Sequence, residues 1–350
     1  MLLLDSRAML ADRQARERAQ TARISDHRSA EIATDTIASL CKASGDALRL
    51  QVLQLLHQDS LAVQELCSLL DIRQPALSHH LKVMATAGLV TKRREGNSIY
   101  YRRAVPDPQT AAGQLLASLL ASLDAVPLSD DLRAGLAKLR VDRVQSSREF
   151  FARNADKFRA PQDLIASYEQ YADTVTDTLN ASSLTQRALA PEVGPGDGAF
   201  LPQLSKAFDS VVALDTAEAM LAQSRARADK LGLGNIEFVH GDTRHTRLDT
   251  LTADCIVVNM VLHHTPSPAS VMSDLARCLA PGGVLLITDL CQHDQDWARD
   301  ACGDLWLGFD PDELAGWAAN AGLSETAGVY LAQRNGFQVQ VRLFGHHSHL

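Results

Sequence analysis

Apolar residues in the first part of the chain recur every three or four positions, which is the spacing of amphipathic helices. Residues 32–56 follow this spacing on both sides of Gly45-Asp46, which predicts two helices with a break between them. A third helix is predicted over 61–70. A fourth is predicted over 74–87, where Pro75 occupies a first-turn position that needs no amide donor. The predicted inward-facing positions of these last two helices are Ala62, Leu66, Leu69, Ala76, Leu77, Leu81 and Met84.

After the fourth helix the pattern changes to that of a β-hairpin. Residues 90–94 and 98–103 flank Gly96-Asn97, a dipeptide suited to a two-residue turn between strands. Two helices separated by a turn and followed by a hairpin are typical of a winged helix-turn-helix. The residues predicted to contact DNA are Gln74, Ser78, His79, His80 and Lys82 in the fourth helix, and Arg93, Arg94 and Asn97 in the hairpin.

The charge distribution supports the DNA-binding prediction. Residues 71–104 contain seven basic and two acidic side chains, a local charge of +5. The whole chain carries −8, so the remaining residues carry −13. A basic module on an acidic protein is expected of a DNA reader, because cations bind phosphates and polar side chains read base edges.

A leucine-rich helix is predicted next, over 109–124. Its apolar stripe is either ordinary core or a dimer contact; a dimer is favoured because it matches a two-fold DNA site. A longer, charged helix over 132–158 is predicted to bridge two domains and to end at Pro161. Residues 162–184 are predicted to be helical and to cover a ligand pocket. The stripe consists of Ala112, Leu115, Leu116, Leu119, Leu120 and Leu123.

The second half of the chain alternates short apolar runs with helical patterns, as α/β domains do. A helix is predicted to end at Ala280, followed by a turn at residues 281–283. A hairpin is predicted around residues 334–336, and residues 297–309 contain two tryptophans and a phenylalanine suited to core packing or to a pocket wall. The predicted strands are 188–190, 211–215, 236–239, 254–260, 284–288, 329–333 and 337–344.

A glycine-rich segment over 192–198 separates the first of these strands from a helix that begins near Phe200. Glycines on alternate positions let the backbone approach a ligand closely and adopt positive φ values. Asp215 ends the second strand, 23 residues after Glu192, where nucleoside-binding folds place an acid that accepts hydrogen bonds from ribose. Pro191 lies within the first strand and is expected to shorten or distort it, because proline cannot donate to a ladder.

These motifs together resemble the class I S-adenosylmethionine-dependent methyltransferase domain, over residues 150–350. They are the acid followed by three alternate glycines, the acid after the second strand, Gly241-Asp242, and Pro-Gly-Gly before the fifth strand. NAD and FAD folds instead use Gly-x-Gly-x-x-Gly. The resemblance implies that Asp215 holds the ribose, Asp242 the adenine amino group, and Met260 the sulfur region. The implied nucleoside site is Glu192, Gly194, Gly196, Gly198, Asp215, Asp242, Thr243, Asn259 and Met260.

Residues 31–105 resemble the ArsR/SmtB family of winged-helix repressors, particularly at residues 45–50, 77–82, 87–90 and 93–97. Arsenic sensors of this family carry two close cysteines after Glu-Leu. At that position, after Glu65-Leu66, this chain has a single cysteine, Cys67. Zinc sensors place Asp and His on the last helix, and the helix after the wing here has no histidine. No metal is therefore expected, and His346, His347 and His349 are interpreted as a solvated tail.

Composition adds two expectations. The six cysteines are scattered without a C-x-x-C pair, which suits a reducing cytoplasm. No apolar run approaches the 18 residues that predict a membrane span. The predicted organisation is a flexible extension over 1–30, a winged helix over 31–105, dimerisation and bridging helices over 106–157, and a nucleoside-binding domain over 158–350.

The two parts together resemble S-adenosylhomocysteine-responsive ArsR-type repressors of the methionine cycle. The resemblance implies a homodimer that binds operator DNA and uses a methyltransferase fold as a sensor of S-adenosylhomocysteine or S-adenosylmethionine, without catalytic residues. The alternative is an active methyltransferase. Asn259-Met260 is not the Asn-Pro-Pro-Tyr type that grips a flipped base, and no arsenic-methyltransferase cysteine cluster is present. His263 or His264 either acts as a base or packs at the strand end.

Overall fold

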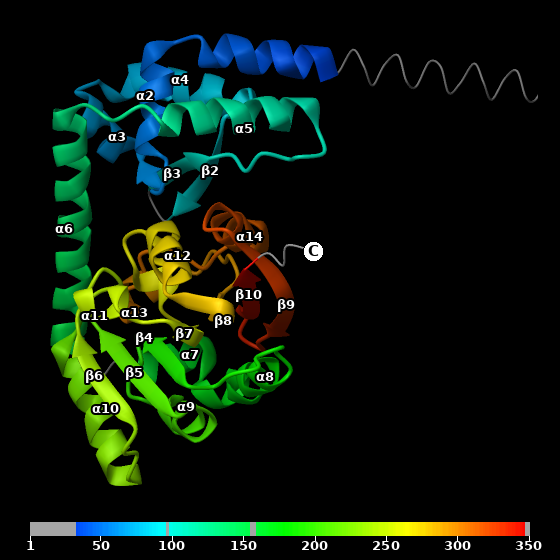
Figure 1. Cartoon of the computed structure of the whole chain (residues 1–350). Coiled ribbons are helices and arrows are strands. Elements are labelled where there is room, and N and C mark those ends of the chain that lie inside the picture. The colour runs from blue at the N-terminus through cyan, green and yellow to red at the C-terminus, as the bar shows by residue number, and fades with distance from the viewer. Residues whose placement is uncertain (1–32, 96–97, 155–158, 347–350) are drawn as a thin grey trace, which may run out of the picture. The chain divides into compact units, whose positions relative to one another are not determined.

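The computed structural model describes residues 33–95, 98–154 and 159–346 (Figure 1). The chain forms two compact units, the first made of residues before Asp130 except 58–60 and 94–100, and the second of those two short segments and the residues from Asp130 onwards. The predicted extension over 1–30, Asn97 and the last two tail histidines lie outside the described residues. No helix in the described part of the chain combines the length and apolar content that a membrane crossing requires.

The first unit is helical with a small sheet, as predicted. Residues 33–44 are helical, and Asp46 caps the next helix by accepting a hydrogen bond from the Arg49 amide (3.0 Å). The sheet has the order β1-β3-β2. After residues 33–44, the elements in chain order are α2 (Ala47–Leu55), β1 (Leu61–Ala62), α3 (Val63–Leu70), α4 (Gln74–Thr86), β2 (Val90–Glu95), β3 (Ser98–Arg103) and α5 (Ala111–Asp124).

Two details of the predicted helices are wrong. Leu61 and Ala62 form β1, and α3 begins only at Val63, because the Glu65 carboxylate accepts the Ala62 amide (2.7 Å) and marks the helix start there. Ala76 is exposed. The inward face of α4 is set by Leu77 and the residues four and seven positions after it, and Ala76 is turned about 100° away from Leu77.

The leucine stripe of α5 is partly core. Leu116 and Leu120 are buried within their own unit, where α5 packs near α2. The other four predicted positions are only partly buried. Of the predicted dimer stripe on α5, only Ala112, Leu115, Leu119 and Leu123 keep surface that a second copy could cover.

The second unit contains a seven-stranded sheet in the order β6-β5-β4-β7-β8-β10-β9. Strands β4 to β8 pair in parallel, and β10 pairs antiparallel with both β8 and β9. This confirms the predicted α/β domain with a C-terminal antiparallel hairpin. The strands are β4 (Leu189–Val193), β5 (Ser210–Asp215), β6 (Ile236–His240), β7 (Ala253–Asn259), β8 (Leu279–Leu290), β9 (Leu323–Ala332) and β10 (Gln338–His346).

Helices cover both faces of this sheet (Figure 1). The helices of this unit begin with the long helix α6 (Asp130–Asn154), followed by α7 (Arg159–Ala166) and α8 (Tyr168–Asn180). The others are α9 (Leu201–Ala207), α10 (Glu218–Leu231), α11 (Thr246–Asp249), η1 (Leu262–His264), α12 (Pro268–Arg277), α13 (Trp297–Cys302) and α14 (Pro311–Asn320).

Each central strand divides its side chains between two cores, as strand geometry requires. In β5, Val211 and Ala213 join the core that includes residues of α8 and α9. Val212 and Leu214 join the opposite core, which includes residues of α12 and α14. Burial on both faces explains why these strands are continuous apolar runs in the sequence.

Pro191 does not shorten β4, which runs through it to Val193, but it limits the pairing of β4 on one side. Strand β4 pairs with β5 over its full length but with β7 only at Glu192 and Val193, after the proline. A proline has no amide to donate, so the ladder toward β7 begins where donors are present again.

Two other predicted boundaries are wrong. Residues 281–283 do not form a turn ahead of a strand, and Ala280 is not helical, because β8 already begins at Leu279. Leu279 pairs with Ala253 and Val284 with Cys255, so the residues between them bulge out of the ladder. Pro161 lies in the first turn of α7, where its missing amide donor is not needed.

Candidate functional site

A cavity of about 380 Å³ lies at the carboxyl ends of the parallel strands. Open α/β sheets bind ligands at this edge, where the loops after several strands converge. Eight of the nine predicted nucleoside-site residues line it: Glu192, Gly194, Gly196, Asp215, Asp242, Thr243, Asn259 and Met260.

The glycine loop after β4 has the conformation that its sequence predicts. Gly194, Gly196 and Gly198 all have positive φ, between 60° and 78°. A Cβ at Gly196 would meet no protein atom within 4 Å, so the space beside this residue is available to a ligand. Gly198 does not line the cavity: a Cβ there would lie 3.1 Å from the Cα of Ser224. The absence of a side chain at Gly198 lets the loop pack against α10, and its predicted part in ligand binding stays a prediction.

Glu192 is the most deeply buried acid of the cavity wall, with 1% of its surface exposed. Nδ2 of Asn259 donates to its Oε1 at 3.4 Å. Burial raises the pKa of Glu192 to about 8, and this one hydrogen bond only partly offsets the loss of solvation. The carboxyl group therefore holds a proton at neutral pH.

Asp215 ends β5 and turns the chain into α10. Its Oδ1 accepts the amide of Ala217 at 2.8 Å. Burial raises the pKa of Asp215 to about 6, against the lowering effect of the amides of Thr216 and Ala217. Asp215 is thus mostly ionised at neutral pH and can accept hydrogen bonds from a ligand hydroxyl.

Asp242 and Thr243 follow β6 and also line the cavity. Burial opposes ionisation of Asp242, but hydrogen bonds from the Arg244 side chain and amide lower its pKa. Oγ1 of Thr243 donates to Asp274 at 2.8 Å. Thr243 is therefore held in place by the protein itself.

Met260 has the unusual backbone of the site. Its φ is 55°, a left-handed value that costs free energy for a residue with a side chain. Its amide donates to the Thr288 carbonyl oxygen at 2.7 Å, which holds the residue at the end of β7. Backbone strain of this kind gathers at binding and catalytic sites.

The sequence predicted a helical cover over the pocket, and residues of α6, α7 and α8 do line the cavity. Phe151, Arg159, Tyr168 and Tyr171 are among them. Arg159 of α7 pairs with Asp197 of the glycine loop at 2.9 Å. Periodicity indicated the segment with Tyr168 and Tyr171, and Asp197 lies within the predicted glycine-rich segment, whereas no motif marks Phe151.

The paired histidines after β7 are both buried. His263 lies with Nδ1 at 2.7 Å from Oδ1 of Asp289, and His264 lines the cavity. Burial alone would lower the pKa of His263, but Asp289 and Asp304 raise it to about 9. Burial and the neighbouring His263 lower the pKa of His264 well below its usual value, so its ring is neutral.

The aromatic residues after β8 do not wall the site. Trp306 and Phe309 are buried in the core shared with α12 and α14, whereas Trp297 is 38% exposed. Between the two roles considered for this segment, the structure assigns core packing to Trp306 and Phe309.

In the first unit, α4 presents most of the predicted DNA-binding residues to solvent. Gln74, Ser78, His79 and Lys82 are exposed. His80 is only partly exposed, because its Nδ1 faces Asp46 at 3.8 Å.

In the hairpin, Arg94 is exposed and Arg93 is partly exposed, while Asn97 lies outside the described residues. Arg103 contributes to the local charge but is turned inward, where it pairs with Asp124 at 2.7 Å. Not every cation of the basic module is therefore available to phosphates.

Comparison with known families assigns both units. Residues 46–92 match the family model of bacterial regulatory proteins of the arsR family. Residues 191–287 match the model of a methyltransferase domain. The two matches fall on the helix-turn-helix and on the strands that carry the cavity.

Individual relatives match parts of the chain. A demethylmenaquinone methyltransferase of Shouchella clausii is 28% identical over 131 residues, which are 37% of this chain and 56% of that protein. An uncharacterized 37.1 kDa protein in transposon TN4556 of Streptomyces fradiae is 31% identical over 130 residues, which are 36% of this chain and 35% of that protein. The chain thus spans about a third to somewhat over half of the length of these two relatives.

Among solved structures, the magnesium protoporphyrin IX methyltransferase of Synechocystis PCC 6803 with bound SAH is 18% identical. Its TM-score is 0.48, and the match covers 57% of this chain and 98% of that chain. The strand order and the two family matches lead to one assignment. The chain joins a helix-turn-helix segment that matches the arsR-family model to a seven-stranded α/β domain that matches the methyltransferase-domain model.

Proposed function

We propose that this protein is a DNA-binding transcriptional regulator whose methyltransferase domain senses S-adenosylhomocysteine and thereby controls operator binding. One observation carries the proposal. Helix α6 follows the DNA-binding unit in the chain, and Arg140, Val144, Ser147 and Phe151 of this helix line the ligand cavity. A ligand in the cavity therefore acts directly on the segment that continues into the DNA-binding unit.

The chemistry of the cavity favours the demethylated nucleoside. S-Adenosylmethionine carries a sulfonium cation, whereas S-adenosylhomocysteine carries a neutral thioether. Glu192 holds its proton at neutral pH, so it provides no full negative charge for a cation. Met260 and Phe151 add apolar surface to the wall. We therefore expect S-adenosylhomocysteine to bind more tightly and to release the protein from its operator.

The proposal includes a homodimer. The partly buried leucines of α5 supply an apolar face, and two copies of the helix-turn-helix would match a two-fold operator. The predicted operator contacts are Gln74, Ser78, His79, His80, Lys82, Arg93, Arg94 and Asn97.

Thermodynamic reciprocity provides the test. A ligand shifts operator affinity only through unequal affinity for two states, typically by about 5- to 150-fold. If S-adenosylhomocysteine weakens operator binding, saturating operator must weaken S-adenosylhomocysteine binding by the same factor. We expect calorimetric titrations with and without operator to differ by that factor. Equal affinities would refute the sensor.

A specific observation favours a second function, an active methyltransferase. Curated relatives are named methyltransferases, and the neutral His264 in the cavity wall can accept a proton from an acceptor substrate. Incubation with S-adenosylmethionine labelled in its methyl group, alone and with operator DNA or small-molecule extracts, decides between the two. Multiple turnovers that fall in His264→Ala would establish the enzyme.

A further inference from the structure

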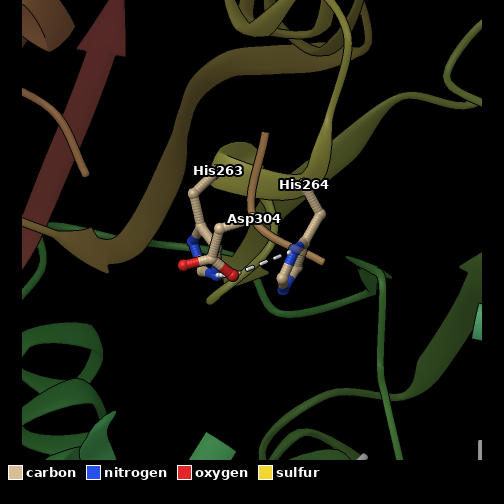
Figure 2. Close-up of side chains that lie close together, drawn as sticks. All are labelled: His263, His264 and Asp304. Atoms are coloured by element: carbon tan, nitrogen blue, oxygen red, sulfur yellow. Dashed lines mark ion pairs between the residues drawn. The ribbon is translucent and has the colours of Figure 1, made fainter. Parts of the chain in front are cut away.

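Three side chains beside the cavity form a cluster that the proposed sensing function does not use. His263 and His264 lie on η1, and Asp304 follows α13, 40 positions after His264 in the sequence. Figure 2 shows the three side chains facing one another. All three are buried, and one ligand atom from each lies within 4.8 Å of the other two.

The backbone brings Asp304 to the histidines. The amides of Leu305 and Trp306 both donate to the carbonyl oxygen of His263, at 2.9 and 3.0 Å. These bonds fix the start of the segment after α13 against η1. Oδ1 of Asp304 then lies 3.9 Å from Nε2 of His263 and 3.5 Å from Nδ1 of His264.

His263 has the orientation of a metal ligand. Its Nδ1 faces Asp289 at 2.7 Å, an arrangement that fixes the ring and leaves Nε2 directed at the cluster. Nε2 is buried and has no hydrogen-bond partner. A buried polar atom without a partner is unfavourable, so a group that binds it would remove that cost. A carboxylate behind a ligand histidine is the usual support of histidine metal sites.

We propose that His263, His264 and Asp304 bind a divalent transition-metal ion, with Asp289 as the residue that positions His263. Ligand atoms around tetrahedral Zn²⁺ are roughly 3.3 Å apart. The two separations from Asp304, 3.5 and 3.9 Å, are close to that spacing, and the ligand nitrogens of the two histidines lie within 4.8 Å of each other. Nδ1 of His264 would exchange its long contact with the Gly303 carbonyl oxygen, 3.3 Å, for the metal.

Two imidazoles and one carboxylate suit Zn²⁺, Co²⁺ or Fe²⁺ rather than Mg²⁺ or Ca²⁺, which prefer oxygen donors. His264 also lines the cavity, which gives the ion a route of entry. The inference is independent of whether the protein is a regulator or an enzyme.

The test uses the full chain without an affinity tag, with His346, His347 and His349 replaced by alanine to remove chelation by the tail. Zn²⁺ affinity and stoichiometry are measured by competition with a chromophoric chelator. We expect one Zn²⁺ per chain in this background. Asp289→Asn should weaken binding by about 10- to 100-fold, and Asp304→Asn and His264→Gln by more. Asp300→Asn, an exposed acid of α13, is the matched control and should bind as the background does.

Spectroscopy of the unsubstituted cluster keeps the proposal testable if a variant fails to fold. Co²⁺ should produce intense visible bands in the tail-substituted protein, and X-ray absorption should show Zn–N distances of about 2.0–2.1 Å. The proposal is overturned if Co²⁺ yields no such bands, or if Asp304→Asn binds Zn²⁺ as the background does. The cluster would then be a buried ion-pair network in which His263 is protonated.

Discussion

At the residue scale, two carboxyl groups of the cavity wall, Glu192 and Asp215, differ in pKa because their surroundings differ. Glu192 lies at the end of a central strand with one weak hydrogen bond, while Asp215 accepts a short amide bond at a helix start. Burial therefore raises the pKa of Glu192 to about 8 and that of Asp215 only to about 6. At neutral pH one group is protonated and the other mostly ionised, so Asp215 is the stronger acceptor for ribose hydroxyls.

Asp215→Ala should weaken binding of S-adenosylhomocysteine by about 1.5–3 kcal/mol, or roughly 10- to 150-fold, because a charge-assisted acceptor is lost. Calorimetry measures this directly. Asp209→Ala, an exposed acid at the other end of the same strand, is the matched control and should bind normally. Unchanged affinity in Asp215→Ala would show that the ribose lies elsewhere.

Glu192→Gln should change how stability depends on pH. Between the ordinary glutamate value of about 4.5 and the folded value of about 8, the folded protein keeps a proton that the unfolded chain loses. Rising pH therefore destabilises the wild type by up to about 1.4 kcal/mol per pH unit across this window, with no further loss above it. The difference in unfolding free energy in favour of Glu192→Gln should grow from pH 5 to 8.

Denaturant titrations at several pH values measure that difference. Glu237→Gln is the control, because its carboxylate pairs with Arg247, which lowers its pKa and places its titration below this window. A constant difference between Glu192→Gln and the wild type would mean that Glu192 is ionised throughout.

At the scale of elements, α4 and the β2–β3 hairpin form the proposed DNA-binding surface. Ser78 and His79 project from α4 into solvent, as residues that read base edges must. Arg94 is exposed on β2, where it is placed to bind phosphate. Base readers and phosphate binders are expected to respond differently to substitution.

Arg94→Ala should weaken binding to all DNA sequences alike and reduce the slope of log affinity against log salt by about one. The measurement is a salt series with operator and with unrelated DNA. Arg133→Ala, at an exposed position of α6, removes the same charge outside the basic module and should leave the slope unchanged. If Arg94→Ala also leaves affinity and slope unchanged, the hairpin does not contact phosphate.

At the scale of the whole molecule, the proposed regulation depends on α6. This helix of 25 residues packs with α10 and lines the cavity, and its N-terminus continues from the DNA-binding unit in the chain. A continuous helix transmits a displacement because its backbone hydrogen bonds resist bending. Local loss of helix stability should therefore reduce coupling more than it reduces either binding reaction.

Ala137→Gly combined with Lys138→Gly should test this, because each glycine costs up to about 1 kcal/mol of helix stability at an exposed interior position. We expect the ratio of S-adenosylhomocysteine affinities with and without operator to move toward one, while ligand affinity without operator is retained. Ala226→Gly with Lys230→Gly at exposed positions of α10 is the matched control. An undiminished ratio would show that α6 does not carry the coupling.

The sequence alone determined the features that depend on neighbouring residues. Periodicity located the strands and most helices, since each periodicity follows from local backbone geometry. The glycines and the acids at strand ends predicted most of the residues that line the cavity, because the carboxyl ends of parallel strands share one edge. Pro191 limited the pairing of β4 with β7 for the local reason that it has no amide donor.

The tertiary structure decided what depends on residues far apart in the chain. Gly198 does not line the cavity because its loop packs against α10, and Arg103 points inward and pairs with Asp124. Phe151 lines the cavity, and Asp304 lies beside His263 although the two are 41 positions apart in the sequence. No local pattern encodes these long-range contacts, because the order of the strands and the paths of the long connections determine them. Strand order and connection paths in turn follow from the packing of the whole domain.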